Sequence, residues 1–227
     1  MTLAEKAYDA LRHDIIRGEL APGRPLRLSD LSERYDMGFS PLREALNRLH
    51  AERLVTAESL RGFRVAPLSL DELHDAVNVR IKVECDALRA SIDLGDDNWA
   101  AGIVSALYAL NLQVGRTGPD ADIWTLEARH YAFHRALLAA CNSPWTLEFF
   151  ERLYAATERY RIPTLLAATH PAGRDVQAEH SALAEATLAR DADKATALLE
   201  AHYRRTADHL TSVFGMDKSS DMAMAIG

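Results

Sequence analysis

The sequence has little of what marks secreted or membrane proteins. Only two of its 227 residues are cysteines, Cys85 and Cys141, so no disulfide framework is expected and a reducing cytoplasm is the predicted location. No uninterrupted apolar run approaches the ~20 residues that a membrane span needs, and no apolar segment follows a basic N-terminus as in a secretory signal, so no membrane partner is expected. The 48% apolar and 26% charged residues are typical of a globular chain, which excludes disorder as the main state.

The acidic charge is unevenly distributed. The formal net charge of −7 taken alone argues against a nucleic-acid partner. Residues 1–68, however, hold 11 Lys and Arg against 10 Asp and Glu, whereas residues 69–227 hold 15 against 23. The first segment can therefore bind an anion while the second carries the acidic excess.

Residues 1–68 predict a small domain of three helices followed by a β-hairpin. Apolar residues at helical spacing alternate with turn signals, and residues 18–26 form a Pro/Gly-rich turn region. Two short β-like pieces follow, with Gly62 suited to the turn between them. The helices are expected over 3–17, from an N-cap at Ser29 through Tyr35 and over about 41–52, and the strands over 54–56 and 63–65. This order describes a winged helix-turn-helix.

The third helix is the expected recognition helix. Ser40 is its predicted N-cap and Pro41 its first helical residue. A major groove ~12 Å wide admits one helix, whose first turn faces the base edges. The expected DNA contacts are Ser40, Arg43, Asn47 and Arg48 on the helix and Arg61, Gly62 and Arg64 in the wing. The alternative is a small helical domain with solvated arginines.

The run from Leu28 to Val65 resembles the DNA-binding domain of the GntR family of bacterial transcription regulators. It shares Asp30-Leu31, the Pro-x-Arg-Glu-Ala-Leu core at 41–46, Leu54-Val55 and the Gly-Phe-x-Val wing at 62–65. Many relatives carry Ser/Thr-Arg-Thr before the proline, whereas this chain has Gly38-Phe39-Ser40. The missing arginine implies a different operator.

Residues 69–215 predict an all-α antiparallel helical bundle, and residues 216–227 a flexible tail. Ser69 is the expected cap of the first helix, Ser143 caps a helix that starts at Pro144, and Pro163 is expected to kink or end that helix. The helices are predicted over 70–94, 99–114, 126–140, 144 to about 168, 176–189 and 194–214.

Four histidines of this bundle are candidate metal ligands. His130 and His134 are four residues apart, so both imidazoles leave the same helix face, and His180 and His202 lie on later helices. Imidazole nitrogens suit a divalent transition metal such as Zn²⁺ or Ni²⁺. The alternative is that they are ordinary core or surface histidines.

The bundle is similar to the FCD-type ligand-binding domain of the FadR subgroup of GntR regulators. The matching pieces are Val79-Arg80 with Glu84, Phe133-His134, Glu179-His180, the run 189–192 and His202. In many members an Asp and three histidines hold a metal, and here His130 stands at the Asp position. The resemblance implies a metal with one charge less compensated, or a site that has lost its metal and binds an anion through the histidines.

A metal in this place has two possible roles. It could activate water in a hydrolase or lyase acting on a small carboxylic acid, with Glu179 as the base. It could instead capture a small organic acid effector, with Arg80 as a second carboxylate clamp and Tyr160 and Arg161 in the pocket wall. Arg80 could equally form a salt bridge with Glu84. Sensing is preferred to catalysis because a DNA reader is fused to the bundle.

An effector class, an assembly and a mode of regulation are also expected. The combination of motifs is similar to carbon-starvation-induced repressors of glutarate and 4-aminobutyrate catabolism, which implies a dicarboxylate effector such as glutarate. Palindromic double-stranded operator DNA requires a twofold reader, so a homodimer is expected. Residues 66–72 are the expected hinge, and repression is the expected mode of regulation.

Overall fold

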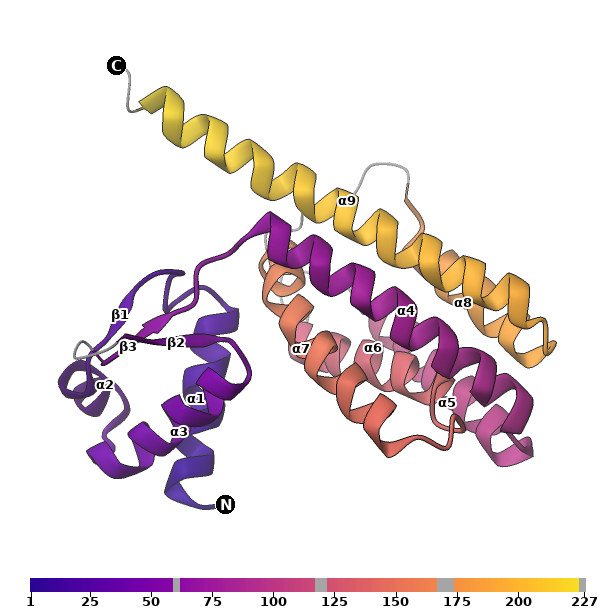
Figure 1. Ribbon diagram of the computed structural model, residues 1–227, viewed down its shortest axis with the longest axis horizontal. Coiled ribbons are helices and arrows are strands. Elements are labelled where there is room, and N and C mark those ends of the chain that lie inside the picture. The colour runs from indigo at the N-terminus through magenta and orange to yellow at the C-terminus, as the bar shows by residue number, and fades with distance from the viewer. Residues whose placement is uncertain (59–61, 117–121, 167–173, 225–227) are drawn as a thin grey trace. The chain divides into compact units, whose positions relative to one another are not determined.

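The structure, a computed structural model, is mainly helical (Figure 1). It describes the chain except residues 59–61, 117–121, 167–173 and 225–227, and it describes no side chains at residues 166 and 215–224. The elements are α1 (Leu3–Ile16), β1 (Pro25–Leu26), α2 (Leu28–Tyr35), α3 (Phe39–Ala51), β2 (Val55–Glu58), β3 (Gly62–Val65), α4 (Leu70–Leu94), α5 (Asp97–Val114), α6 (Ile123–Leu137), α7 (Pro144–Leu166), α8 (Val176–Leu188) and α9 (Ala192–Met224). The expected fold class, a winged helix-turn-helix followed by an all-α domain, is confirmed.

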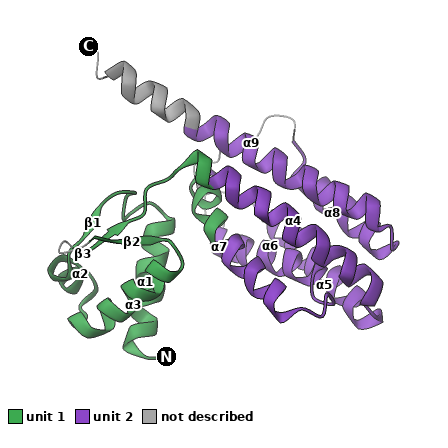
Figure 2. Ribbon diagram, viewed as in Figure 1, with its two compact units in different colours: residues 1–72, 155–163 green, residues 73–154, 164–227 purple. Residues whose placement is uncertain are grey.

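The chain forms two compact units (Figure 2). The first unit is Met1–Glu72 together with Ala155–Pro163 of α7, and the second is Leu73–Tyr154 together with Thr164–Gly227. The sequence-based boundary at residue 68 did not anticipate the part of α7 in the first unit. Glu158 from that part pairs with Arg12.

The first unit contains a three-stranded antiparallel sheet in the order β1-β3-β2. In the wing, Val55 pairs with Val65 and Glu58 with Gly62. Leu26 of β1 pairs with Phe63, although the sequence placed this segment in a turn region. A two-residue strand is too short to show apolar alternation, so only the tertiary pairing reveals it.

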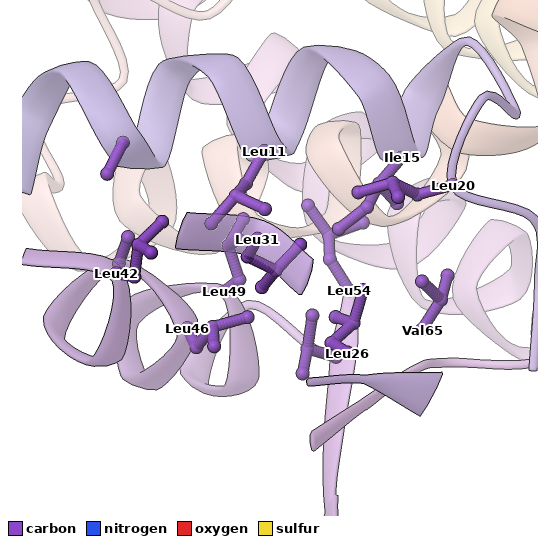
Figure 3. Packing of buried hydrophobic residues seen from close by; sticks show 13 residues of the cluster. Leu11, Ile15, Leu20, Leu26, Leu31, Leu42, Leu46, Leu49, Leu54 and Val65 are labelled. Atoms are coloured by element: carbon purple, nitrogen blue, oxygen red, sulfur yellow. The ribbon is translucent and has the colours of Figure 1, made fainter. Parts of the chain in front are cut away.

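One hydrophobic core holds α1, α2, α3 and the sheet together (Figure 3). Each helix contributes the apolar stripe that its spacing predicts. The core residues labelled in the figure are Leu11, Ile15, Leu20, Leu26, Leu31, Leu42, Leu46, Leu49, Leu54 and Val65. Burial of this stripe fixes α3 in rotation and turns its other face outward.

Two predicted helix starts in this unit are wrong. The N-cap of α2 is Arg27, without a side-chain cap, and Ser29 bonds to Asp30 instead. The N-cap of α3 is Gly38, so Ser40 lies inside the first turn rather than capping it. Proline is tolerated in this turn because the first N–H groups of a helix have no intrahelical partner in any case.

In the second unit, α5 packs against α6 and α8, and α8 packs against α9. Trp99 of α5 donates from Nε1 to the carbonyl of Ala136 at 3.0 Å. Over the described residues from 69 on, every regular element is helical. None of the described helices combines the length and apolar character of a membrane span.

Helix ends in the bundle differ from the prediction by a few residues. The Ser143 hydroxyl accepts from Thr146 N at 3.3 Å, so its predicted cap is confirmed. Pro163 does not end α7, which continues to Leu166. The predicted tail starts at residue 216, inside the range of α9, and the side chains from 215 on lie outside the described part.

Candidate functional site

The outer face of α3 carries the predicted helix contacts to DNA. Exposed side chains on it are Ser40, Arg43, Asn47 and Arg48. Arg43 and Asn47 are one turn apart and share a line along the helix. The Arg48 guanidinium lies 4.0 Å from the centre of the Tyr8 ring, which holds its stem against α1. The core therefore positions a polar helix face that fits a major groove.

In the wing, one of the predicted DNA contacts, Arg64, already has partners within the protein. Gly62 is exposed and has a φ of 88°, a conformation that favours glycine. Arg64 pairs through Nε with Glu58 Oε1 at 2.7 Å and also donates to the carbonyl of Gly23. A phosphate contact by Arg64 must compete with these partners. Arg61 lies outside the described residues.

The second unit brings four histidines together. His130 and His134 come from α6, His180 from α8 and His202 from α9, and one ligand nitrogen of each lies within 4.8 Å of the others. His134, His180 and His202 are buried, and His130 is half-buried. Packing of the helices brings together side chains that lie up to 72 positions apart in the sequence.

Two of these imidazoles are backed by a tyrosine and a glutamate. The Tyr154 hydroxyl lies 2.7 Å from His130 Nδ1 and donates to Glu127 Oε1 at 2.6 Å. A hydroxyl that donates to a carboxylate accepts from its other neighbour, so Nδ1 of His130 carries the proton. The Nε2 lone pair is then available to a metal.

His134 has the same arrangement. The Tyr203 hydroxyl lies 3.1 Å from His134 Nδ1 and donates to Glu84 Oε2 at 2.5 Å. His134 Nε2 is buried and has no hydrogen-bond partner among the described residues. Such an orphaned acceptor is costly unless a ligand occupies it, so the donor set fits a borderline transition metal.

His202 is backed by a carboxylate directly. Its Nδ1 lies 2.8 Å from Glu179 Oε2, and Arg174 and Arg205 pair with the same carboxylate at 2.7 and 3.0 Å. Burial alone would raise the pKa of Glu179, but hydrogen bonds from His202 and Arg174 hold it well below its usual range. Glu179 is thus held by three partners, which leaves it poorly placed as the base of a hydrolase.

Burial and neighbouring charges disfavour the protonated forms of His134 and His202. Burial lowers the pKa of His134 well below 6.5, and the other three histidines and Arg80 lower it further. Burial also lowers the pKa of His202, and it outweighs the opposing hydrogen bond to Glu179. Neutral imidazole is the form that ligates a metal.

The predicted effector contacts are divided between the two compact units. Arg80 is buried, its Nε lies 2.6 Å from Glu84 Oε1, and it donates to the Tyr203 hydroxyl at 3.1 Å, so the salt-bridge alternative is the one observed. Tyr160 and Arg161 belong to the first compact unit. The Tyr160 hydroxyl accepts from the backbone N–H of Ser69 and donates to its carbonyl.

Sequence reasoning missed the backing residues. Tyr154 and Tyr203 carry no motif, since a tyrosine at helical spacing is an ordinary core residue. Glu127 precedes His130 by three positions on α6 and so shares its helix face, which is the one signal that could have found it.

Comparisons with known proteins identify both units. Residues 3–65 match the bacterial regulatory proteins of the gntR family, and residues 75–205 match the FCD domain. The chain is 42% identical over 205 residues to the helix-turn-helix transcriptional regulator BphR of Paraburkholderia xenovorans (strain LB400), covering 88% of this chain and 82% of BphR. It is 36% identical over 197 residues to the transcriptional repressor GlaR of Escherichia coli (strain K12), covering 86% and 90%.

The fold is also shared with a solved structure. Escherichia coli McbR/YncC superposes with a TM-score of 0.75 at 22% identity, over 94% of this chain and 99% of that one. These relatives are transcription regulators rather than enzymes. The chain belongs to the GntR family of bacterial transcription regulators and carries an FCD domain, as in the FadR-like subgroup.

Proposed function

We propose that the protein is a repressor whose affinity for operator DNA is controlled by a small carboxylate bound at a metal in the FCD domain. The observation that carries the proposal is the convergence of His130, His134, His180 and His202 inside the bundle. The repressor name of the relative GlaR supports the sign of regulation.

The metal would be held by Nε2 atoms of the four histidines. Four uncharged nitrogen donors favour a borderline ion such as Zn²⁺ or Ni²⁺ over a hard ion that prefers oxygen. When bound, such an ion acts as a Lewis acid that attracts a carboxylate oxygen. Glu127, Glu84 and Glu179 orient three of the imidazoles from behind.

Charge balance favours an anionic effector. Three arginines and three glutamates lie around the histidines, and their formal charges cancel. They are Arg80, Arg174 and Arg205, and Glu84, Glu127 and Glu179. Since all four imidazoles ligate as neutral groups, a divalent ion adds two positive charges without compensation in a largely buried place. A small organic acid, and a dicarboxylate such as glutarate in particular, supplies that compensation.

Regulation requires that effector binding change the affinity of the protein for operator DNA. We expect two subunits to bind a palindromic operator in the cytoplasm, each through α3. Effector binding need supply only ~1–3 kcal/mol of coupling to change operator occupancy by 5–150-fold.

The test begins with elemental analysis of the purified protein. Dicarboxylates are then screened by thermal shift with and without chelator, and operator affinity is measured for each state. We expect stoichiometric metal, a chelator-sensitive shift and weaker operator binding with effector. A protein that binds dicarboxylates equally well after chelation contradicts the proposal.

Variants separate metal from DNA. His134→Ala should abolish metal retention and the effector response but leave operator binding of the apo protein intact. The matched control is His74→Ala, an exposed histidine of α4 bonded to Thr211. Loss of metal in the control variant would contradict the assignment.

A further inference from the structure

We infer that Phe39 contacts the methyl group of a thymine in the operator and thereby sets sequence specificity. The inference rests on the DNA-binding family of the chain and is independent of the metal and effector proposed above. Phe39 is the first residue of α3, and it is 54% exposed.

Phe39 differs from the other aromatic residues of its unit. Tyr8, Tyr35 and Phe63 pack against the hydrophobic core, and Tyr160 is 2% exposed. Single exposed apolar residues are common on protein surfaces, so exposure alone assigns no role. The role of Phe39 is inferred from its position on α3.

Phe39 extends the polar line of the recognition helix. Phe39, Arg43 and Asn47 follow one another at intervals of four residues, so they lie along one helix face, and all three are exposed. The opposite stripe of α3 is buried in the core. A groove that receives Arg43 and Asn47 therefore also meets the ring of Phe39, at the N-terminal end of the helix.

The approach to the ring is open, because more than half of the Phe39 residue surface is exposed. In helix-turn-helix proteins the N-terminal residues of the second helix contact base edges. The ring of Phe39 therefore lies where a base edge is expected when α3 enters the major groove.

The chemistry of the ring selects thymine. In the major groove thymine presents an apolar C5 methyl group beside its O4 acceptor, whereas the edges of guanine, cytosine and adenine present hydrogen-bonding atoms without a methyl group. A phenyl ring satisfies none of those atoms, and covering them without a partner is unfavourable. Burying one methyl group corresponds to a change of roughly three- to tenfold in affinity.

The experiment uses the full chain and a selected operator. Duplexes enriched from a random pool by the wild-type protein are resynthesised with uracil in place of each thymine in turn, which removes only the methyl group. We expect one thymine per half-site at which uracil weakens wild-type binding about three- to tenfold. Phe39→Ala should bind the thymine and uracil duplexes equally, and Phe39→Leu should retain a preference for thymine.

Controls separate this contact from folding and from DNA binding in general. Leu3→Ala removes another exposed apolar side chain of the same unit and should leave the uracil effect unchanged. Thermal melting checks that each variant folds. An enriched operator without any uracil-sensitive thymine, or an undiminished effect in Phe39→Ala, overturns the inference. Failure to enrich any sequence would instead contradict DNA recognition by this unit.

Discussion

At the residue scale, the histidine cluster depends on groups that do not touch its centre. His130, His134 and His202 each direct Nδ1 to a hydroxyl or carboxylate oxygen. This arrangement fixes the ring orientation and leaves Nε2 for a ligand. The cluster is therefore organised before any metal binds, which lowers the entropic cost of binding one.

Tyr154→Phe should weaken metal binding by about tenfold, because His130 loses the hydroxyl that fixes its ring and tautomer. Competition with a chromogenic chelator measures the affinity. Tyr131→Phe is the matched control, since the Tyr131 ring packs edge-on against the Tyr154 ring at 5.0 Å and is absent from the histidine hydrogen bonds described above. Equal metal affinities for Tyr154→Phe and the wild type would refute this role.

The apo protein should lose stability as the pH falls below about 6.5. Burial lowers the pKa of His134 and His202 in the folded state below the ordinary histidine value of 6.5, so the unfolded chain binds more protons below that pH. Each histidine contributes about 1.4 kcal/mol per pH unit between its unfolded and folded pKa values. The stabilisation is fully present above 6.5 and is lost on acidification.

Thermal unfolding of chelated protein between pH 7.5 and 5.5 checks this expectation. His134→Gln removes one buried titrating group and should show a shallower fall of Tm with pH. His74→Gln, at an exposed position, should keep the wild-type slope. A wild-type slope in His134→Gln would show that this histidine does not drive the acid sensitivity.

At the element scale, α3 serves two purposes with two faces. Leu42, Leu46 and Leu49 are fully buried and hold the helix in the core. Arg43 and Asn47 on the exposed face are not part of that core and are left for base and phosphate contacts. Changes on the two faces should therefore separate stability from DNA affinity.

Arg43→Ala should cost about 1–3 kcal/mol of operator affinity with little change in Tm, because the side chain is exposed. Fluorescence anisotropy with labelled duplex measures the loss. Arg17→Ala, at the exposed C-cap of α1, is the control and should bind DNA normally. Unchanged affinity in Arg43→Ala would mean that α3 is not the recognition helix.

Leu46→Ala on the buried face should destabilise the protein by about 2–5 kcal/mol, because it leaves a cavity in a packed core. Chemical denaturation measures the free energy of unfolding. Where the variant remains folded, its operator affinity should match the wild type. A loss of affinity without a loss of stability would contradict the division between the faces.

At the scale of the whole molecule, the chain joins a unit with nearly balanced charge to an acidic one. The acidic excess of residues 69–227 keeps the bundle from competing for DNA phosphates. The histidine cluster nevertheless favours an anion locally, since a bound divalent ion would dominate its immediate field. The net charge of the bundle therefore disfavours contact with DNA, whereas the local charge of a metal-loaded histidine cluster would favour the anionic effector.

Removing the metal should uncouple the two halves of the function. Chelated protein is expected to bind operator DNA as the wild type does, but added dicarboxylate should no longer weaken that binding. Anisotropy titrations with and without chelator, followed by restoration with Zn²⁺, provide the measurement. A persistent effector response in the fully chelated protein would show that sensing does not require the metal.

Local patterns in the sequence determined much of this protein. Amphipathic spacing and caps such as Ser143 predicted the long helices, because these depend on residues within one or two turns. The family motifs at 41–46 and 62–65 predicted the DNA-binding unit, and the pair His130 and His134 followed from helix geometry alone. The strand Pro25–Leu26 and the start of α3 at Phe39 were not predicted, since pairing and packing outweigh weak local signals there.

Tertiary structure alone decided which distant side chains meet. The arrival of His180 and His202 beside the α6 pair and the backing of His130 and His134 by Tyr154 and Tyr203 both depend on how helices pack. Helical periodicity specifies which face a residue occupies but not which helix that face will meet. That choice arises from the packing of the whole bundle.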